Sequence, residues 1–584
     1  MAPRRRSRRG TTPSPDLELP DADELERLKL SPEVAWYMVS RQVPLPDCPP
    51  AVKTPEPGEV LSDAVFDPER VDRVLKAFEH LRHTKGKWAG RPLRPDPWQV
   101  AYVIAPTFGW VHRNDDGVWV RVVTELFVEV PRKGGKSTLC GGLGIYLTCA
   151  DGEAGAEVII AATGLRQAGY VFEPVKQLAE SSPALRPHVK PLKRKIVHRA
   201  SGSYMECVAA VADAMHGGNI HGGVVDELHL HRDPGLVEAI ETGTGSREQP
   251  LIVFITTTDD GQTTTVYARK RDRIEKLAER VITHPSSYGV IWCADEADDP
   301  FAEVTWRKAN PGFGISPTRR YLADAAEKAR EDPAELAGFL RLHLGIRTGL
   351  AARYIPLDVW DRNAGLVDRD GLAGRLCYGG LDLATTSDLT AFCLVFPDEL
   401  GGYDVLWRHW IPERAFKALD ERTAGQAKVW RRLGLITVTP GDVTDYQFVR
   451  RDINSDRELF DVVDIGYDRW NSSQVCIELA DDGASMVKMG QGFATLSAPF
   501  KSLKHELLAG SVEAPRFRHG GNQLVRWQAT NLRAEEDSAG NVKPSKKASM
   551  DKIDGFSAAV NAMARAMAAD TGRSIYEDSD LEVG

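Results

Sequence analysis

The stretch Val130-Pro-Arg-Lys-Gly-Gly-Lys-Ser-Thr138 decides the fold class of this 584-residue chain. The apolar run Leu126-Phe-Val-Glu-Val130 leads into it, and a helical run of small residues follows. A strand, a glycine-containing loop and a helix in this order form a phosphate-binding loop, because backbone N–H groups at glycines can surround phosphate oxygens. We predict that Lys136 reaches the β- and γ-phosphates of ATP and that the Ser137 hydroxyl binds Mg²⁺. The predicted nucleotide site also contains Gly135 and Thr138.

A pair of neighbouring acids follows a second apolar run, in Gly223-Val-Val-Asp-Glu-Leu-His229. ATP hydrolysis requires one carboxylate that holds Mg²⁺ and a second that activates the attacking water. Asp226 suits the first role and Glu227 the second. Taken alone, the pair also fits a helix N-terminus, where acids stabilise the helix dipole. Because the phosphate-binding loop precedes it by about 90 residues, the pair predicts an ATPase.

Two further motifs agree with a nucleotide site. Pro97-Trp-Gln99 precedes the loop, and we expect the Gln99 amide to read the adenine edge of ATP. An ordinary helix start is the alternative for this motif. Thr256-Thr-Thr258 follows an apolar run. We expect the threonine hydroxyls at this strand end to sense the γ-phosphate and to couple hydrolysis to movement. A polar strand terminus is the alternative for the threonines.

Three aspartates in the C-terminal half form a second candidate site. They are Asp382 after Tyr378-Gly-Gly-Leu, Asp468 after Val462-Val-Asp-Ile-Gly-Tyr, and Asp554 in Lys552-Ile-Asp-Gly. An RNase H-like fold assembles a two-metal site from two acids at strand ends and one acid at a helix start. The carboxylate oxygens of these acids are suitable ligands for Mg²⁺ or Mn²⁺. From spacing alone, loop and helix-cap aspartates remain the commoner explanation. Three neighbouring acids compete for the same roles: Asp388, Asp464 and Asp551.

The pattern of apolar runs predicts the fold class. Short runs rich in β-branched residues alternate with helical stretches over about residues 60–265, which is typical of a parallel sheet covered by helices. Residues 266–350 are charge-rich and mostly helical in pattern. Further on, 377–382 and 391–396 flank a polar turn and predict an antiparallel hairpin. An alanine-rich helix is expected near the end, over 555–569.

We therefore predict an α/β protein with two catalytic domains. Residues 1–58 are expected to form an arm and accessory segment that is partly disordered. The remaining predicted segments are an ASCE-type P-loop ATPase domain with a parallel sheet at 59–265, a helical linker subdomain at 266–350, an RNase H-like α/β nuclease domain at 351–570 and an acidic tail at 571–584.

Composition and charge exclude several classes. The 74 Lys and Arg against 83 Asp and Glu give a net charge of −9, which excludes a uniformly basic DNA coat. Two local basic stretches, 186–199 and 501–552, fit either a phosphate-backbone contact or a solvated face. The 8 cysteines form no CxxC pair, which indicates a reducing cytosol without zinc or disulfides. No apolar run approaches the roughly 18–20 residues that span a bilayer, so we expect no membrane partner.

Taken in order, these motifs resemble the large terminase subunit of tailed bacteriophages. The resemblance covers about residues 60–570 and rests on Pro97-Trp-Gln, Pro131-Arg-Lys-Gly-Gly-Lys-Ser, Val225-Asp-Glu-Leu-His, Thr256-Thr-Thr, Gly380-Leu-Asp-Leu, Gly466-Tyr-Asp-Arg-Trp and Lys552-Ile-Asp-Gly. It implies a packaging ATPase followed by an RNase H-like nuclease, which cuts concatemeric viral DNA and threads it into an empty procapsid. In this family the phosphate-binding motif is often degenerate, as it is here, where Val130 stands in place of its first glycine. In some relatives a basic residue early in the loop also matters, so the resemblance adds Arg132 as a phosphate contact.

The resemblance also implies residue roles, cofactors and partners. The ATPase roles fall to Lys136, Ser137, Asp226 and Glu227, and the metal-ligand roles to Asp382, Asp468 and Asp554. The implied cofactors are ATP and Mg²⁺, or Mn²⁺ at the nuclease site. The implied partners are double-stranded DNA, a portal protein, a small terminase subunit and further copies of the chain in a pentamer. The implied location is the host cell cytoplasm, with transient attachment to the procapsid portal.

Two other functional classes fit parts of the sequence. An ATP-driven DNA helicase or remodeller, whose C-terminal domain only grips DNA, has no need of Asp382, Asp468 and Asp554. A non-enzymatic assembly protein that uses nucleotide as a switch has no need of Glu227. Plasmid digestion with Mn²⁺ separates the first class from a terminase, and steady-state ATP turnover separates the second class from both enzymes.

Overall fold

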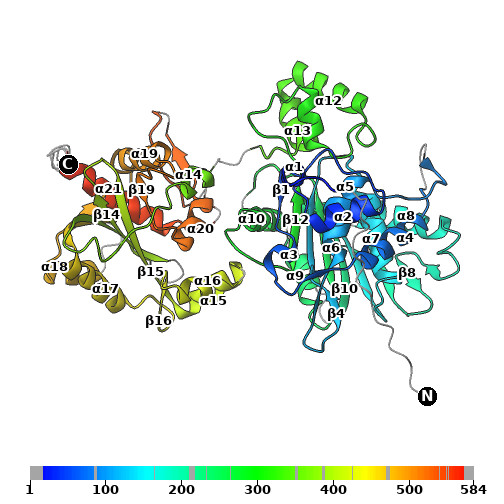
Figure 1. Cartoon of the computed structure of the whole chain (residues 1–584), viewed down its shortest axis with the longest axis horizontal. Coiled ribbons are helices and arrows are strands. Elements are labelled where there is room, and N and C mark those ends of the chain that lie inside the picture. The colour runs from blue at the N-terminus through cyan, green and yellow to red at the C-terminus, as the bar shows by residue number, and fades with distance from the viewer. Residues whose placement is uncertain are drawn as a thin grey trace. The chain divides into compact units, whose positions relative to one another are not determined.

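Alternating apolar runs and helices build two separate units of the chain. The computed structural model describes residues 18–83, 88–162, 165–209, 218–231, 233–262, 265–348, 353–384, 389–423, 425–468, 474–537, 539–546, 549 and 551–570. The first unit comprises Met1–Glu279 with His284–Leu350, and the second comprises Arg280–Thr283 with Ala351–Gly584. Each unit has its own sheet and its own helices (Figure 1).

A mixed sheet forms the centre of the first unit. Its strands are β1 (Val52–Lys53), β5 (Glu125–Glu129), β6 (Glu157–Ala162), β7 (Val189–Pro191), β8 (Lys195–His198), β9 (Tyr204–Ala209), β10 (Ile220–Asp226), β11 (Leu251–Thr256) and β12 (Ser287–Ile291). Within the described residues their order is β1-β12-β5-β11-β10-β6-β9-β8-β7. The strands from β12 to β9 pair in parallel, and β1, β8 and β7 add antiparallel pairs at the two edges. The parallel sheet predicted for this region is confirmed.

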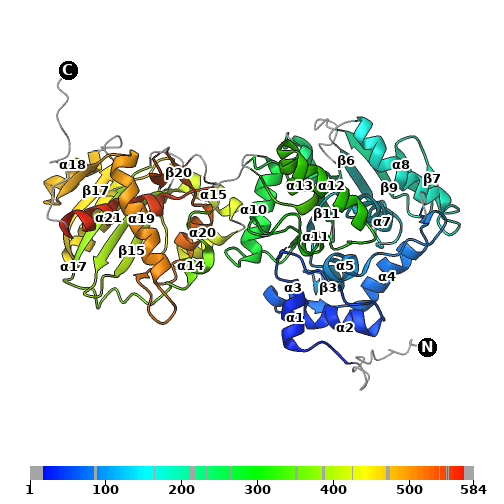
Figure 2. The same cartoon turned by 90° about the horizontal axis from the view of Figure 1, so that it is seen from above.

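Helices cover both faces of this sheet (Figure 2). Four of them are α7 (Lys136–Cys149), α8 (Leu165–Ser181), α9 (Gly235–Thr242) and α10 (Val266–Ala278). A Cβ on Gly222 would meet Leu147 of α7 at 3.0 Å, and a Cβ on Gly223 would meet Ile240 of α9 at 2.6 Å. Because successive strand residues point to opposite faces, α7 and α9 lie on opposite faces of the sheet. Helix α8 packs beside α7, and α10 packs on β12 and β5.

One strand lies in the segment that the sequence pattern assigned to helices. Strand β12 falls within residues 266–350, and it pairs with β5 on one side and β1 on the other. All five of its residues are buried, so this short apolar run extends the central sheet. The helical prediction is therefore wrong for this strand. It missed the strand because charged helices on both sides dominate the local composition.

Three helices that follow β12 share a small hydrophobic core. They are α11 (Glu303–Ala309), α12 (Arg319–Glu331) and α13 (Pro333–Leu344). Their apolar faces contribute Ala309, Leu322 and Phe339 to a cluster that also contains Ala294 and Ile346. We refer to α11, α12 and α13 as the helical cluster. Its own core lets it fold as a layer beside the sheet within the first unit.

The remaining elements of the first unit lie before or between the sheet strands. They are α1 (Ala22–Leu28), α2 (Pro32–Ser40), α3 (Pro57–Val60), β2 (Val65–Phe66), α4 (Pro68–Glu79), α5 (Pro97–Gln99), η2 (Val100–Ile104), α6 (Ala105–Gly109), β3 (Trp110–Arg113), β4 (Trp119–Arg121) and η4 (Leu228–Leu230). Among the described residues, no helix combines the length and the apolar character that a membrane-spanning segment needs.

A second mixed sheet organises the second unit. Its strands are β13 (Leu376–Asp382), β14 (Thr390–Pro397), β15 (Tyr403–Pro412), β16 (Thr437–Thr439), β17 (Asp461–Asp468), β18 (Met486–Met489) and β19 (Phe517–Arg518). Within the described residues the order is β16-β15-β14-β13-β17-β18, with β19 pairing with β15. Strands β13 and β14 are antiparallel, which confirms the predicted hairpin, whereas β17 runs parallel to β13. A separate pair consists of β20 (Ala534–Glu536) and β21 (Val542–Pro544).

Helices cover the second sheet on both faces. They are α14 (Leu357–Asp361), α15 (Glu413–Arg422), α16 (Gln426–Arg432), α17 (Tyr446–Leu459), α18 (Gln474–Asp481), α19 (Phe493–Ala509), α20 (Gln523–Asn531) and α21 (Asp554–Asp570). A Cβ on Gly380 would lie 2.0 Å from the Ala558 carbonyl oxygen, so α21 packs directly on this strand. The neighbouring Leu381 joins the core that α17 and α18 cover. Even-numbered residues of β13 therefore face α21 and odd-numbered residues face α17 and α18.

Candidate nucleotide and metal sites

The phosphate-binding loop joins β5 to α7, as the sequence predicted. Gly135 has a φ of +75°, which glycine adopts without strain. A Cβ on Gly134 would approach Val130 Cγ2 to 2.7 Å, so the loop can return this closely only with glycine there. Ser137 and Thr138 are exposed in the first turn of α7. A helix N-terminus with exposed hydroxyls favours an anionic ligand.

Lys136 folds back into its own loop. Its Nζ donates hydrogen bonds to the carbonyl oxygens of Val130 at 3.1 Å and Pro131 at 3.4 Å. Burial lowers the pKa of Lys136, while the nearby Glu227 and Asp226 act in the opposite direction. The ammonium group is therefore held inside the loop, close to both predicted acids.

The strands that carry the nucleotide motifs end at the same edge of the sheet. Strand β11 lies between β5 and β10, and the three strands are parallel. Their register places Ile255 beside both Val128 and Asp226. One strand between the loop strand and the acidic strand is the order of an ASCE-type ATPase, as predicted. Burial and the neighbouring Glu227 raise the pKa of Asp226 to about 6, so this carboxylate gains from a bound cation.

Glu227 is held by polar side chains from the neighbouring segments. It directly follows β10 and has a φ of +50°, an uncommon conformation for a residue with a side chain. The Thr257 hydroxyl donates a hydrogen bond to Glu227 Oε2 at 3.2 Å. His229 Nδ1 lies 3.3 Å from the same oxygen and 3.0 Å from Thr256 Oγ1. The predicted water-activating acid is thus linked to the threonine segment, and the sequence analysis had given His229 no role.

Gln99 lies at the loop and also caps a helix. Its Oε1 accepts a hydrogen bond from the Asp96 backbone N–H at 2.9 Å. Its Nε2 would be 3.4 Å from a Cβ placed on Gly135, so the amide borders the phosphate-binding loop. The neighbouring Trp98 packs edge-to-face on Trp292, with ring centroids 5.0 Å apart. The motif therefore starts a helix and also places an amide beside the loop, while the contact of Gln99 with adenine stays a prediction.

The helical cluster contacts the phosphate-binding loop. The Arg132 backbone N–H donates to the Leu342 carbonyl at 2.8 Å, while the Arg132 side chain remains exposed. The Ser316 hydroxyl donates to the Lys133 carbonyl at 2.5 Å. A separate ion pair joins Arg347 Nε to Asp259 Oδ1 at 2.7 Å, just after the threonine segment. These contacts connect the helical cluster to two motifs of the nucleotide site, which local sequence patterns do not reveal.

In the second unit, two of the three predicted metal ligands face helix α21 and the third begins it. Asp382 and Asp468 end the neighbouring parallel strands β13 and β17, and the register pairs the residues just before them, Leu381 with Tyr467. Both aspartates occupy even-numbered positions, which face α21. Asp554 is the first residue of α21. The fold therefore brings the three acids to one sheet edge, under one helix N-terminus.

A lysine lies between two of these acids. Lys546 Nζ is 2.9 Å from Asp382 Oδ2 and 3.0 Å from Asp554 Oδ1. Burial raises the pKa of Asp382 to about 6, although Lys546 acts to lower it. The second oxygen of Asp554, Oδ2, is buried and has no hydrogen-bond partner among the described residues. A buried carboxylate oxygen without a donor fits a metal ligand, because such an oxygen is costly to leave unpaired.

The described residues contain no group of three His, Cys, Asp or Glu side chains already close enough to hold a metal ion. Two of the competing acids have other partners. Asp464 forms a two-point ion pair with Arg565 of α21, with distances of 3.0 and 2.7 Å. Asp551 lies 3.6 Å from Arg422. Asp388 lies outside the described residues.

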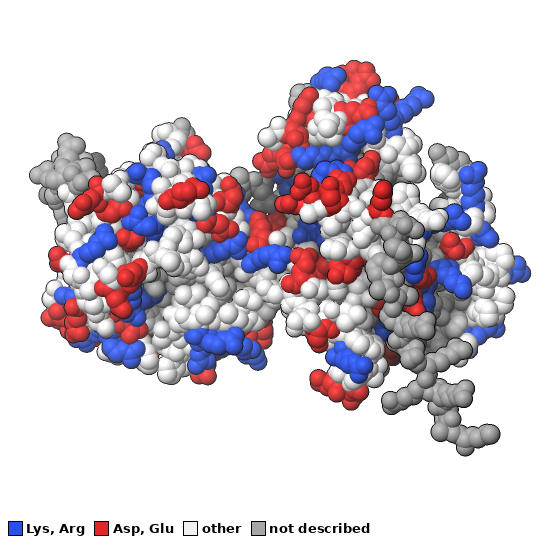
Figure 3. All heavy atoms as spheres, viewed as in Figure 1, with Lys and Arg blue, Asp and Glu red and all other residues white. Residues whose placement is uncertain are grey.

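The two basic stretches differ in how far their charges are already paired. In 501–552, the guanidinium groups of Arg516, Arg518 and Arg526 pair with acids outside or inside that stretch at 2.6–2.7 Å. In 186–199, five cations on or near the β7–β8 hairpin are exposed: Arg186, Lys190, Lys193, Arg194 and Arg199. Figure 3 shows Lys and Arg atoms gathered along the edge of the first unit that carries β8. We call these five residues the basic hairpin surface, and it is the better candidate for phosphate contacts.

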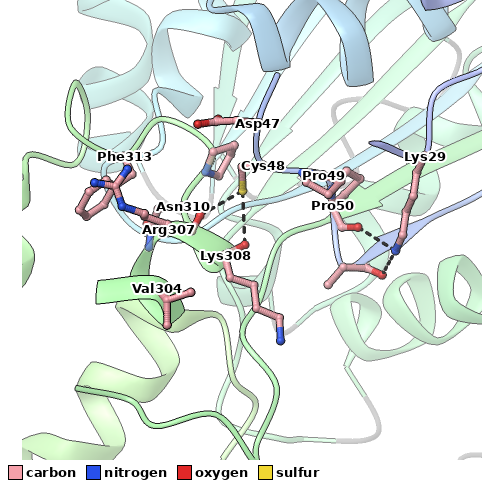
Figure 4. Close-up of a pocket in the computed structure, with 12 residues that line it drawn as sticks. Lys29, Asp47, Cys48, Pro49, Pro50, Val304, Arg307, Lys308, Asn310 and Phe313 are labelled. Atoms are coloured by element: carbon pink, nitrogen blue, oxygen red, sulfur yellow. Dashed lines mark hydrogen bonds between the residues drawn. The ribbon is translucent and has the colours of Figure 1, made fainter. Parts of the chain in front are cut away.

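A cavity of about 490 Å³ lies elsewhere in the first unit (Figure 4). Its cations are already paired, since Lys29 donates to two backbone carbonyls and Lys308 and Arg307 form ion pairs with acids. It is lined by Lys29, Asp47, Cys48, Pro49, Pro50, Ala51, Val304, Arg307, Lys308, Asn310, Pro311 and Phe313. No predicted site residue is among them, so the cavity is separate from the nucleotide site.

Comparisons with known proteins match two consecutive segments of the chain to domains of one family. The family model "Terminase large subunit, ATPase domain" matches residues 97–276, and "Terminase large subunit, endonuclease domain" matches residues 282–570. The chain is 27% identical over 498 residues to the "Terminase, large subunit" of Enterobacteria phage HK97, covering 83% of this chain and 94% of that protein. It is 29% identical over 379 residues to "Protein YmfN" of Escherichia coli (strain K12), covering 62% of this chain and 80% of that protein.

A solved structure is also similar. The "Crystal structure of the HK97 bacteriophage large terminase" aligns with a TM-score of 0.49 and 25% sequence identity, covering 85% of this chain and 99% of that chain. The assignment itself rests on the two family models, which match consecutive segments that together span most of the sequence. The chain therefore belongs to the terminase large subunit family and carries its ATPase domain and its endonuclease domain.

Proposed function

We propose that the chain hydrolyses ATP in its first unit to move double-stranded DNA into a procapsid, and cuts concatemeric DNA in its second unit by two-metal chemistry. The observation that carries the proposal is that Asp382 and Asp468 end neighbouring strands on the face covered by α21, and that Asp554 begins α21, in a chain that also has an ATPase core. A DNA helicase or remodeller that only grips DNA does not need these acids.

In the first unit, each residue of the nucleotide site has a separate role. Lys136 balances the β- and γ-phosphate charge, and the exposed hydroxyls of Ser137 and Thr138 bind the Mg²⁺ that accompanies ATP. Gln99 contacts the adenine from beside the loop, and the exposed Arg132 side chain contacts phosphate. Two further roles fall to the acids that end β10: Asp226 holds the Mg²⁺ through water, and Glu227 orients the attacking water.

In the second unit, Asp382, Asp468 and Asp554 supply oxygen ligands for Mg²⁺ or Mn²⁺. The buried Asp554 Oδ2 and the absence of Cys or His from this trio favour a hard divalent cation over zinc. Bound divalent ions stabilise charge on the scissile phosphate and lower the pKa of an attacking water. The protein holds its carboxylates on two strand ends and a helix start, so their spacing is set by rigid elements.

The partners follow from this activity. Double-stranded DNA contacts the basic hairpin surface through its phosphates. A portal protein and a small terminase subunit direct the chain to the procapsid and to the DNA, and the working state is a pentamer of this chain. The chain acts in the host cell cytoplasm and attaches to the portal only during packaging. Residues 351–570 form the nuclease domain, and the ATPase domain of 59–265 is completed by β12 and by the helical cluster of 266–350.

Plasmid digestion with Mn²⁺ tests the nuclease assignment. Asp382→Asn, Asp468→Asn and Asp554→Asn should each abolish cleavage, because each removes one ligand charge from the metal site. Asp461→Asn is the matched control, since Asp461 is an exposed acid at the opposite end of β17. Cleavage at the wild-type rate by the Asp382 variant would show that the second unit cuts elsewhere or only binds DNA.

A further inference from the structure

A positive charge of the protein itself lies where the metal ligands converge. Lys546 follows β21, and its Nζ contacts one oxygen of Asp382 and one oxygen of Asp554 at 2.9 and 3.0 Å. The two acids come from different elements, β13 and α21, so the ammonium group bridges the strand end and the helix start. No function assigned above to this site uses Lys546.

The position of the Lys546 ammonium group between Asp382 and Asp554 has an electrostatic cause. The Asp382 and Asp554 side chains are 8% and 3% exposed, so two carboxylates share a nearly dry space. Like charges in such a space repel, and a cation between them relieves the repulsion. Lys546 supplies this cation, because its Nζ lies within hydrogen-bond distance of one oxygen of each acid.

The two ion pairs hold the tip of the Lys546 side chain, while much of the side chain is exposed to solvent. It is 56% exposed, so it enters the acid pair from the solvent side. Because more than half of the side chain is exposed, its stem can turn outward into water without opening the core. The acid oxygens can thus exchange one cation for another while the strands and α21 stay in place.

We propose that Lys546 is a built-in competitor of the divalent metal ion, occupying the shared oxygens of Asp382 and Asp554 until a metal displaces it. This inference rests on the proposed metal site. A divalent ion and the ammonium group require the same two oxygens, so binding of one excludes the other at those atoms. The lysine therefore sets the metal concentration at which the nuclease becomes active. It restrains cutting while the ATPase, which receives Mg²⁺ together with ATP, already works.

The test measures binding of Mn²⁺ alone to the full-length chain without nucleotide, by titration calorimetry. The variants are wild type, Lys546→Met, Lys546→Arg and the control Lys543→Met. Lys543 lies on neighbouring β21 and pairs with Glu535 at 3.7 Å, so its loss removes the same charge without touching the acids. The double variant Asp382→Asn/Asp554→Asn defines the signal from all other sites. Circular dichroism confirms that each variant is folded.

Loss of the competing charge should tighten Mn²⁺ binding of Lys546→Met by about tenfold relative to wild type. Lys546→Arg and Lys543→Met should stay within about twofold of wild type, because the first retains the charge and the second leaves the bridge intact. The melting temperature of Lys546→Met should be lower without metal and should rise more than that of wild type on Mn²⁺ addition.

Two different failures can be told apart. Equal or weaker Mn²⁺ affinity of Lys546→Met, with a signal that disappears in the double Asp variant, overturns the competition and leaves the metal site intact. A signal that is unchanged in the double Asp variant shows that Asp382 and Asp554 do not bind the metal, and it refutes the proposed nuclease site itself.

Discussion

The Thr257 hydroxyl donates a hydrogen bond to Glu227 Oε2 at 3.2 Å, across two parallel strands that end side by side. This contact joins Glu227, the acid proposed to orient the attacking water, to the segment that follows β11. Asp259, two residues after Thr257, forms an ion pair with Arg347, which follows α13 of the helical cluster. The segment after β11 thus contacts both Glu227 and the chain that leaves the helical cluster.

Replacing Thr257 should impair catalysis more than substrate binding. Thr257→Val keeps the side-chain shape but removes the donor to Glu227, so the acid loses its orientation. We expect kcat for ATP to fall roughly tenfold, with KM nearly unchanged, because a hydrogen bond to a charged group contributes about 1.5–3 kcal/mol. Thr257→Ser should restore turnover. Steady-state ATPase assays with DNA present check this, and a Thr257→Val enzyme with wild-type kcat would contradict the orienting role.

Replacing Lys136 should remove ATP hydrolysis. Lys136→Ala deletes the charge that compensates the phosphates, and turnover should fall by roughly two orders of magnitude or more. Lys176→Ala on α8, the helix that packs beside α7, is the control, because it removes a lysine that lies outside the loop. Steady-state ATPase measurements compare them. If Lys136→Ala retains most of its turnover, the phosphate-binding assignment of this loop is wrong.

The basic hairpin surface should control DNA affinity and its dependence on salt. The double change Lys193→Glu/Arg194→Glu replaces two exposed cations, and each lost phosphate contact should reduce the slope of log affinity against log salt by about 0.9. Arg320→Glu/Lys328→Glu on α12 makes the same charge change at other exposed positions. Fluorescence anisotropy of a labelled DNA duplex over a salt series measures the slope. Equal slopes for both double variants would show that DNA does not contact the basic hairpin surface.

Gly380 should be needed for stability of the second unit. A Cβ there would lie 2.0 Å from the Ala558 carbonyl oxygen and 2.5 Å from the Ala562 nitrogen, so Gly380→Ala forces α21 away from β13. The cost should be about 1–3 kcal/mol, with a lower melting temperature and weaker DNA cleavage because α21 carries Asp554. Gly492→Ala is the control, since its Cβ would meet nothing within 4 Å. Thermal unfolding that is the same for both variants would contradict the close packing.

The sequence was most informative where chemistry is local. A glycine-containing loop between a strand and a helix, and two acids at a strand end, are motifs within a few residues, so Lys136, Asp226 and Glu227 could be placed in advance. The antiparallel hairpin formed by β13 and β14 was also predictable from the turn between two apolar runs. Strand alternation explains in addition why Asp382 and Asp468 face the same helix.

Contacts between distant segments were not predictable from patterns. Lys546 and Asp382 are 164 residues apart, and no local signal distinguishes this lysine from the other cations of its basic stretch. Strand β12 was missed because its identity depends on its neighbours in the sheet rather than on its flanking charged helices. The contact between Arg132 and the helical cluster likewise depends on tertiary packing.

The central claim is that one chain hydrolyses ATP and cuts DNA at two separate sites. The most direct measurement compares wild type, Glu227→Gln and Asp382→Asn in two assays on the same preparations, steady-state ATP turnover with DNA and plasmid cleavage with Mn²⁺ but no nucleotide. We predict that Glu227→Gln loses roughly two orders of magnitude of ATP turnover and still cleaves, whereas Asp382→Asn hydrolyses ATP normally and does not cleave. Wild-type cleavage by Asp382→Asn, or near-wild-type ATP turnover by Glu227→Gln, would contradict the account.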